Sequence, residues 1–160
     1  MARTLPPPEK LLALLERTAP RIAAATKGVP SIRLQTVPDG DEWSPNDVLA
    51  HLRSCADVWG NSIRMILAED EPTIRAVSPR TWIRETNYPD LRFAPSFRAF
   101  AKQRAGLLDV LRPLPAKAWT RTATVTGGGA PLRLTLRRYA ERMAVHERAH
   151  AGQIERMLAP

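Results

Sequence analysis

Four segments with apolar residues at helical spacing constrain the fold of this chain more than any other feature. Prolines mark the connections between these segments, and the spacing predicts helices over residues 8–26, 45–68, 95–113 and 136–158. No sustained alternation of apolar and polar residues indicates a β-strand, and no segment repeats at a fixed period. The sequence therefore predicts an all-α protein, a four-helix bundle formed by a single domain of 160 residues.

The predicted helix from residue 45 has the clearest start in the sequence. Ser44 is a favoured N-cap residue, Pro45 suits the first helical position, and Asp47 is placed to complete a capping box. Thr135 is the expected N-cap of the last helix. Pro20 is expected to kink or divide the first helix, because proline lacks the N–H that an internal helical position donates.

The connections between the helices differ in length. Residues 27–43 form a predicted loop, and residues 69–95 form a long surface connection with one short helical turn around Trp82. The glycines at 127–129 lack the Lys-Ser/Thr pair and the preceding strand of a phosphate-binding P-loop. We interpret them as a flexible turn.

The chain is basic, with 24 Lys and Arg against 16 Asp and Glu and a net charge of +8. A basic balance is a first indication of a nucleic-acid or anionic-membrane partner. In the last predicted helix, however, arginines alternate with Glu141, Glu147 and Glu155, a pattern typical of a solvated helix face. We therefore expect a diffuse basic surface on a soluble protein. A binding protein whose basic surface meets nucleic acid or another protein stays as the competing class.

The cysteine content and the N-terminal sequence bear on the compartment. Cys55 is the single cysteine, so the chain has no internal disulfide. The first ten residues lack the apolar stretch of a secretory signal, and no segment is apolar over the length of a membrane span. We expect a cytoplasmic protein.

The three histidines carry the chemical signal. His146 and His150 lie one helical turn apart, on the stripe of the last helix that we expect to face the bundle interior. His51 lies beside the apolar stripe of the second helix. Such rings need a polar partner if they are buried, so one interpretation is a three-nitrogen metal site. The other is that they are ordinary hydrogen-bonded core histidines, and spacing alone does not decide between the two.

Residues near the histidines have two interpretations each. Asp47 is placed to orient His51 or to cap its own helix, and capping is the favoured role. Gln153 is placed to hydrogen-bond His150. Cys55, one turn after His51, is either a fourth metal ligand or, as we prefer, a small core residue. The four tryptophans are expected to be core or loop anchors rather than substrate platforms: Trp43, Trp59, Trp82 and Trp119.

Two segments, Trp-Ser-Pro-Asn-Asp-Val-Leu-Ala-His-Leu at 43–52 and His-Glu-Arg-Ala-His-Ala-Gly-Gln-Ile at 146–154, resemble the DinB-like superfamily. The resemblance covers nearly the whole chain. It implies a four-helix bundle of up-down-down-up topology. It also implies a metal triad with one histidine on the second helix and two on the fourth, which corresponds to His51, His146 and His150.

The resemblance also implies a class of chemistry. Members of this superfamily include S-transferases and isomerases that use zinc or nickel and a low-molecular-weight thiol such as mycothiol or bacillithiol, and bundles of this type often form homodimers. Our leading hypothesis is a metalloprotein that transfers a thiol to a small electrophile, or catalyses a related hydrolytic or isomerising step. The segment 69–95 is expected to border its pocket, where Arg75, Arg80 and Arg84 would favour an anionic substrate.

Overall fold

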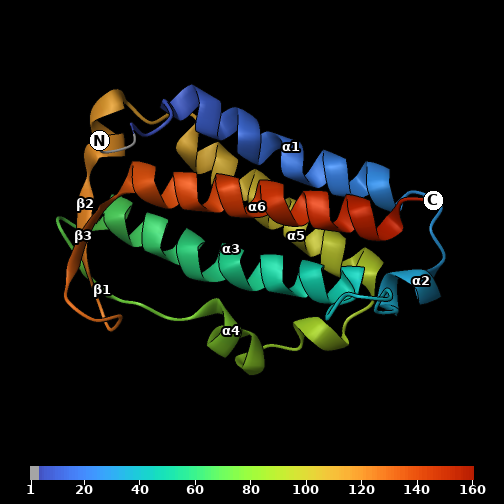
Figure 1. Ribbon diagram of the computed structural model, residues 1–160. Coiled ribbons are helices and arrows are strands. Elements are labelled where there is room, and N and C mark those ends of the chain that lie inside the picture. The colour runs from blue at the N-terminus through green and yellow to red at the C-terminus, as the bar shows by residue number, and fades with distance from the viewer. Residues whose placement is uncertain (1–3) are drawn as a thin grey trace.

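Four long helices form a bundle in the computed structural model, which describes residues 4–160 (Figure 1). These helices are α1 (Pro8–Thr26), α3 (Pro45–Ala68), α5 (Phe93–Leu111) and α6 (Leu136–Leu158). Each packs against two of the others, in the cyclic order α1, α6, α3, α5. Helices α1 and α6 run in one direction and α3 and α5 in the other. The predicted four-helix bundle and its up-down-down-up topology are confirmed.

The parallel course of α3 and α5 explains the long connection between them. Because α5 begins at the end of the bundle where α3 also begins, the chain must return along the full length of the bundle (Figure 1). This crossover, residues 69–92, holds β1 (Thr73–Arg75), α4 (Pro79–Trp82) and two 3-10 turns, η1 (Ile83–Glu85) and η2 (Tyr88–Asp90). The predicted surface connection and its helical turn at Trp82 are confirmed. The loop before α3 holds one further short helix, α2 (Ser31–Gln35).

A small sheet at one end of the bundle is the feature that sequence analysis missed. Strand β1 pairs in parallel with β2 (Thr122–Thr126), which pairs antiparallel with β3 (Leu132–Thr135). In this register Val125 lies between Ile74 and Leu132. The glycines at 127–129 form the turn of the hairpin, and Gly127 and Gly129 have φ angles of 90° and 108°. Strands of three to five residues are too short to show a period of two. A 3-10 turn, η3 (Ala116–Thr120), precedes the hairpin.

The predicted helix starts are confirmed at α3 and α6. The Ser44 hydroxyl accepts from the Asp47 amide at 3.2 Å, and the Asp47 carboxylate accepts from the Ser44 amide at 2.9 Å, so the capping box is complete. The Thr135 hydroxyl accepts from the Arg138 amide at 3.1 Å. Pro20, by contrast, does not divide α1, which is continuous from Pro8 to Thr26.

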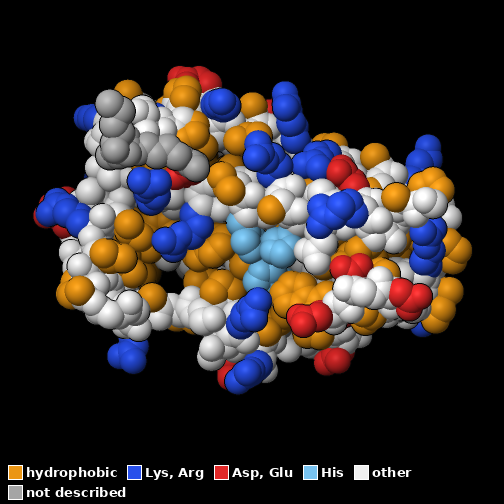
Figure 2. Space-filling view, viewed as in Figure 1, with side chains coloured by type: hydrophobic (Ala, Val, Ile, Leu, Met, Phe, Trp, Pro, Cys, Tyr) orange, Lys and Arg blue, Asp and Glu red, His pale blue; other side chains and the backbone are white. Residues whose placement is uncertain are grey.

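The surface mixes charges of both signs. Figure 2 shows Lys and Arg side chains spread over one face of the molecule, with acidic side chains among them and no continuous basic stripe. Across residues 4–160, no helix has both the length and the apolar character that a membrane span requires.

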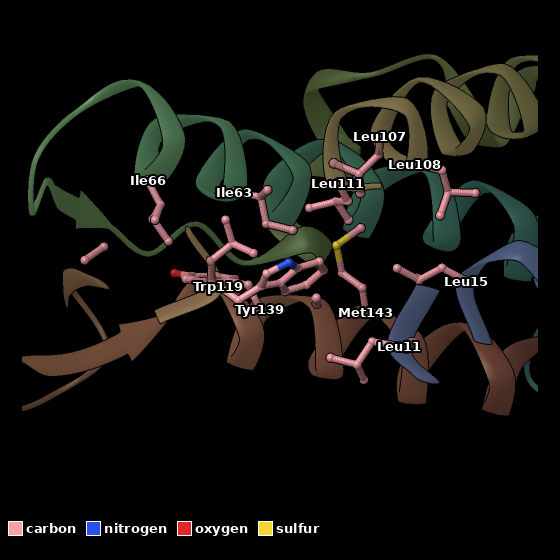
Figure 3. Close-up of a cluster of buried hydrophobic side chains, with 14 of the residues drawn as sticks. Leu11, Leu15, Ile63, Ile66, Leu107, Leu108, Leu111, Trp119, Tyr139 and Met143 are labelled. Carbon is pink, nitrogen blue, oxygen red and sulfur yellow. The ribbon is translucent and has the colours of Figure 1, made fainter. Parts of the chain in front are cut away.

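The apolar core consists of two clusters along the bundle. The cluster nearer the sheet contains side chains from all four long helices and from η3, among them Leu11, Ile63, Leu107, Trp119 and Met143 (Figure 3). The second cluster, nearer α2, includes Ile22, Leu52, Phe100 and Ile154. Trp119 is 4% exposed and is the core anchor that the sequence predicts.

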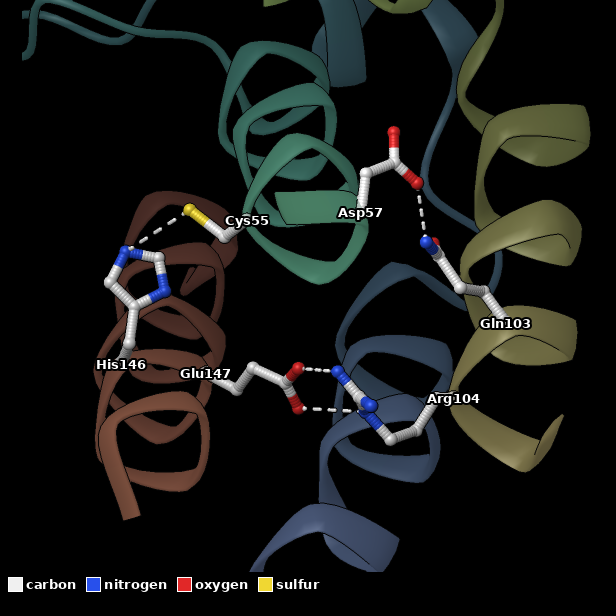
Figure 4. Close-up of polar contacts among 6 residues, drawn as sticks. All are labelled: Cys55, Asp57, Gln103, Arg104, His146 and Glu147. Atoms are coloured by element: carbon white, nitrogen blue, oxygen red, sulfur yellow. Dashed lines mark hydrogen bonds and ion pairs between the residues drawn. The ribbon is translucent and has the colours of Figure 1, made fainter. Parts of the chain in front are cut away.

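A buried polar layer separates the two apolar clusters. Arg104 of α5 and Glu147 of α6 are each 2% exposed and form an ion pair through two guanidinium nitrogens (Figure 4). The Thr18 hydroxyl of α1 also hydrogen-bonds the Glu147 carboxylate. Burial raises the pKa of Glu147, and the Arg104 guanidinium opposes that shift. Charge is therefore tolerated in the centre of the bundle because it is paired.

The position of Glu147 corrects the expected solvated face of the last helix. Glu141 and Glu147 are 4% and 2% exposed, whereas Glu155 stays at the surface and binds Arg21 at 2.7 Å. The buried stripe of α6 passes through Ala144, Glu147, Ala151 and Ile154. This stripe is rotated by about one residue from the predicted one, because a buried arginine on α5 supplies a partner for an inward carboxylate.

Replacing Arg104 by Met should lower the free energy of unfolding by about 3 to 5 kcal/mol, because Glu147 would be left buried without its cation. The double variant Arg104→Met/Glu147→Leu should recover most of this loss, since no charge then remains in the core. Urea unfolding measures both. The matched control is Arg112→Met, which breaks an exposed ion pair with Glu16 and should cost less than about 1 kcal/mol. Equal losses for Arg104→Met and Arg112→Met would contradict the assignment.

Candidate metal centre

The three histidines meet between α3 and α6, on the side of the bundle that the crossover borders. The Nε2 atom of His146 lies 3.0 Å from Nε2 of His51 and 3.1 Å from Nε2 of His150. The rings of His51 and His150 are 5.0 Å apart between centroids. The prediction that the rings of His146 and His150 face the bundle interior is wrong. They are half-buried at the edge of the buried stripe, because Glu147 takes the inward position.

The histidines open into a cavity of about 790 Å³. Figure 2 shows the three side chains at the middle of one face, surrounded by hydrophobic side chains and with basic and acidic groups nearby. Trp43 and Trp59 form two of the walls, with ring centroids 5.1 Å from His51 and 5.0 Å from His146. Arg80 of the crossover lies over the Trp43 ring, 5.8 Å from its centroid.

Two of the four tryptophans are anchors, as predicted, and the other two line the cavity. Trp82 and Trp119 are anchors, as predicted, and Trp82 donates to the Asp57 carboxylate at 2.9 Å. Trp43 and Trp59, however, line the cavity. A partial signal was present for Trp59, which lies on α3 two turns after His51, whereas Trp43 precedes α3 and no helical spacing relates it to the histidine.

The environment of the histidines keeps them uncharged. Burial, with smaller contributions from the charges of His150 and Arg80, lowers the pKa of His51 to about 4. Burial and the two neighbouring histidines lower the pKa of His146 to about 3. Burial also lowers the pKa of His150, against the effect of Gln153. At neutral pH the rings are therefore neutral, which is the form that binds metal.

Gln153 fixes the protonation of one ring. Its Oε1 atom lies 2.7 Å from Nδ1 of His150. An amide oxygen only accepts, so His150 carries its proton on Nδ1 and its Nε2 presents a lone pair to the other histidines. The predicted hydrogen bond of Gln153 is confirmed. Asp47 has the capping role that the sequence favoured, and Nδ1 of His146 finds no hydrogen-bond partner among residues 4–160.

Cys55 lies beneath the histidines on the core side of the site. Its Sγ atom is 3.6 Å from Nε2 of His51. It is 3.8 Å from Nε2 of His146, a contact that Figure 4 shows. The side chain is 2% exposed, and burial raises the pKa of the thiol to about 12. His51, Cys55 and His146 form a group that could hold a metal ion, so both interpretations of Cys55 from the sequence remain open.

The spacing of the nitrogens fits a metal ion. Imidazole nitrogens bound about 2.1 Å from zinc lie about 3.0 to 3.4 Å from each other at ligand angles of about 90 to 110°. The two measured separations, 3.0 and 3.1 Å, fall in this range. Two lone pairs at either separation repel each other unless a proton or a cation lies between them.

Comparison with solved structures gives the same fold at low sequence identity. YfiT from Bacillus subtilis, described as a probable metal-dependent hydrolase with an unusual four-helix bundle topology, superposes with a TM-score of 0.72 at 19% identity over 93% of this chain and 86% of that one. A protein from Streptococcus pneumoniae gives 0.72 at 12% identity, over 98% and 92%. The mycothiol-dependent maleylpyruvate isomerase gives 0.66 at 16% identity, over 93% of this chain and 61% of the isomerase.

Sequence comparison identifies the family. No curated protein matches the sequence. The sequence model of the DinB superfamily matches residues 14–154, a span that includes all four long helices in part or whole and every histidine. With the bundle topology and the histidine cluster between α3 and α6, this match shows that the chain belongs to the DinB superfamily.

Proposed function

We propose that His51, His146 and His150 bind one divalent metal ion and that the site catalyses transfer of a low-molecular-weight thiol to a small electrophile. The observation that carries the proposal is the convergence of three neutral Nε2 atoms, 3.0 and 3.1 Å apart, at the edge of a cavity of about 790 Å³. Imidazole ligands suit zinc and nickel, and we propose one of these as the ion.

Three neutral nitrogen ligands would leave the charge of the bound ion unchanged. A divalent ion held by these three neutral ligands would keep its full charge and would lower the pKa of a bound thiol or water molecule. Gln153 orients His150, and the Trp43 and Trp59 rings restrict the approach of water from two sides. The cavity has the volume of a small-molecule site, more than a water molecule needs.

The proposed reaction forms a carbon–sulfur bond. The thiol sulfur attacks an electrophilic carbon of the second substrate, the leaving group departs with its electron pair, and the thiol proton goes to solvent. The resemblance to thiol-dependent members of the superfamily supports this chemistry, as does the fold shared with the mycothiol-dependent isomerase. Hydrolysis is the second candidate, favoured by the fold shared with YfiT.

Replacing His51, His146 or His150 by Ala should each lower the affinity for zinc or nickel by more than about 100-fold, because loss of outer hydrogen-bond partners alone costs about 10- to 100-fold. Elemental analysis and competition with a chelator measure the bound metal. Circular dichroism checks that the helices persist.

Cys55→Ser is the matched control for the histidine variants. If the three histidines are the ligands, it should keep one ion per chain, and the cobalt-substituted protein should lack the absorption of a protein thiolate ligand. Full metal retention in all three histidine variants would reject the site. Metal loss in Cys55→Ser would add Cys55 to the ligands.

Replacing Gln153 by Ala should lower the metal affinity by about 10- to 100-fold, because His150 would lose the acceptor that holds its proton on Nδ1. Gln153→Glu keeps an acceptor at this position and should retain most of the affinity. Chelator competition on both variants decides the point. Equal affinity in the wild type and Gln153→Ala would show that His150 needs no such partner.

The metal-loaded protein should accelerate the reaction of mycothiol or bacillithiol with 1-chloro-2,4-dinitrobenzene by at least about tenfold over His51→Ala, since the ion is the source of the activated nucleophile. Absorbance follows the product, and mass spectrometry identifies the sulfur adduct. Product formed at the same rate without thiol, and containing oxygen from water, would reject thiol transfer in favour of hydrolysis.

A further inference from the structure

A second, smaller compartment adjoins the cavity of the histidines. Its volume is about 400 Å³, and it shares Trp43, His51 and Arg80 with the main cavity. Its remaining wall includes the apolar side chains of Ala50, Ile83 and Pro89. Helix α3 provides one side of this compartment and the crossover provides the other, so His51 lies where the two spaces meet.

Arg80 is the cation of this compartment and it lacks an internal counter-ion. No carboxylate of residues 4–160 forms an ion pair with its guanidinium, which instead lies over the Trp43 ring. Among the arginines that the sequence predicted at the pocket, Arg80 is the one that lines it. Arg75 borders a separate hollow, and Arg84 is exposed on η1.

The acidic groups near the histidines leave Arg80 available to a ligand. Asp47 lines the small compartment, but its carboxylate already accepts from the Ser44 amide at 2.9 Å and the Ser44 hydroxyl at 2.7 Å. Asp41 and Glu42 line the main cavity. The compartment therefore combines one unpaired guanidinium with apolar walls, and an anion with an apolar body matches both.

The crossover that carries Arg80 is anchored to the bundle. The Asp57 carboxylate of α3 accepts from Trp82 Nε1 at 2.9 Å and from the Tyr88 hydroxyl at 2.7 Å. Its other oxygen accepts from Gln103 of α5 at 2.5 Å (Figure 4). Arg80 precedes Trp82 by two residues, so these bonds hold the segment that carries its exposed side chain beside the cavity.

We propose that this compartment binds a compact carboxylate with an aromatic or short aliphatic body, the carboxylate on Arg80 and the body between Trp43 and Ile83. The volume of about 400 Å³ admits a small ring system with its carboxylate. Its role as the electrophilic substrate rests on the function proposed above, with the thiol in the main cavity. Because the two spaces share Trp43, His51 and Arg80, substrates bound in them would lie next to each other, as group transfer requires.

Benzoate is the probe, and its uncharged analogue benzamide is the matched ligand. Calorimetric or NMR titration should show benzoate binding that weakens by at least about fivefold in Arg80→Gln, roughly the contribution of one charge-assisted hydrogen bond at an exposed side chain. Arg84→Gln removes the same charge from the same segment and should bind benzoate as the wild type does. Ile83→Trp, which fills the compartment, should also weaken binding.

Two comparisons make the result decisive. Benzamide should bind more weakly than benzoate to the wild type and should not respond to Arg80→Gln. The titrations are run with metal-loaded and with chelator-treated protein, because a carboxylate also binds an ion directly. Equal benzoate affinity in Arg80→Gln and Arg84→Gln, or binding only in the presence of metal, overturns the inference. A chain that binds benzoate as expected but takes up no metal overturns the proposed function instead.

Discussion

The ion pair between Arg104 and Glu147 determines how the helices of this bundle fit together. Both side chains are 2% exposed, so a shift of α6 by one turn would leave two charges buried without partners. The pair therefore fixes the register of α6 against α5, and the Thr18 hydroxyl adds α1 to the same layer. His146 precedes Glu147 directly. Consecutive residues lie about 100° apart around a helix, so the contact that fixes Glu147 against α5 also fixes His146 on the adjoining face of α6, toward α3.

The up-down-down-up topology produces the cavity as well as the bundle. Two adjacent parallel helices, α3 and α5, require a connection that runs the length of the bundle, and this connection passes the side where α3 and α6 present their histidines. Asp57 fastens it there through Trp82 and Tyr88. A bundle with short loops between antiparallel neighbours would leave the same three imidazoles on an open surface. The crossover supplies Arg80 and one wall of each compartment.

Much of this structure could be predicted from the sequence because its signals are local. The capping residues Ser44 and Thr135 and the apolar stripes mark the helices, and the spacing of His146 and His150 indicates the site. The sheet could not be predicted, because β1 acquires its structure by pairing with β2, about fifty residues away. The inward turn of Glu147 depends on Arg104 of another helix. Arg104 lies on the apolar stripe of α5, where an arginine needs a buried anionic partner. This position was the one sign in the sequence that a carboxylate of another helix points inward.

One face of α6 contributes to the stability of the bundle, and the adjoining face carries two histidines of the candidate site. The inward residue Glu147 forms an ion pair with Arg104, so the free energy of burying its carboxylate depends on a partner within the protein. The histidines at the edge are neutral, since burial lowers their pKa values, and their Nε2 atoms contact one another and the Cys55 sulfur. Gln153 provides a hydrogen-bond partner for the other nitrogen of His150. The Nε2 atom of His146 lies 3.0 and 3.1 Å from those of His51 and His150, close enough for a shared proton or for one bound cation. The contact of Glu147 is complete within the bundle, whereas a cation from solution could bind the nitrogens of all three rings at once, which is the basis of the metal site proposed above.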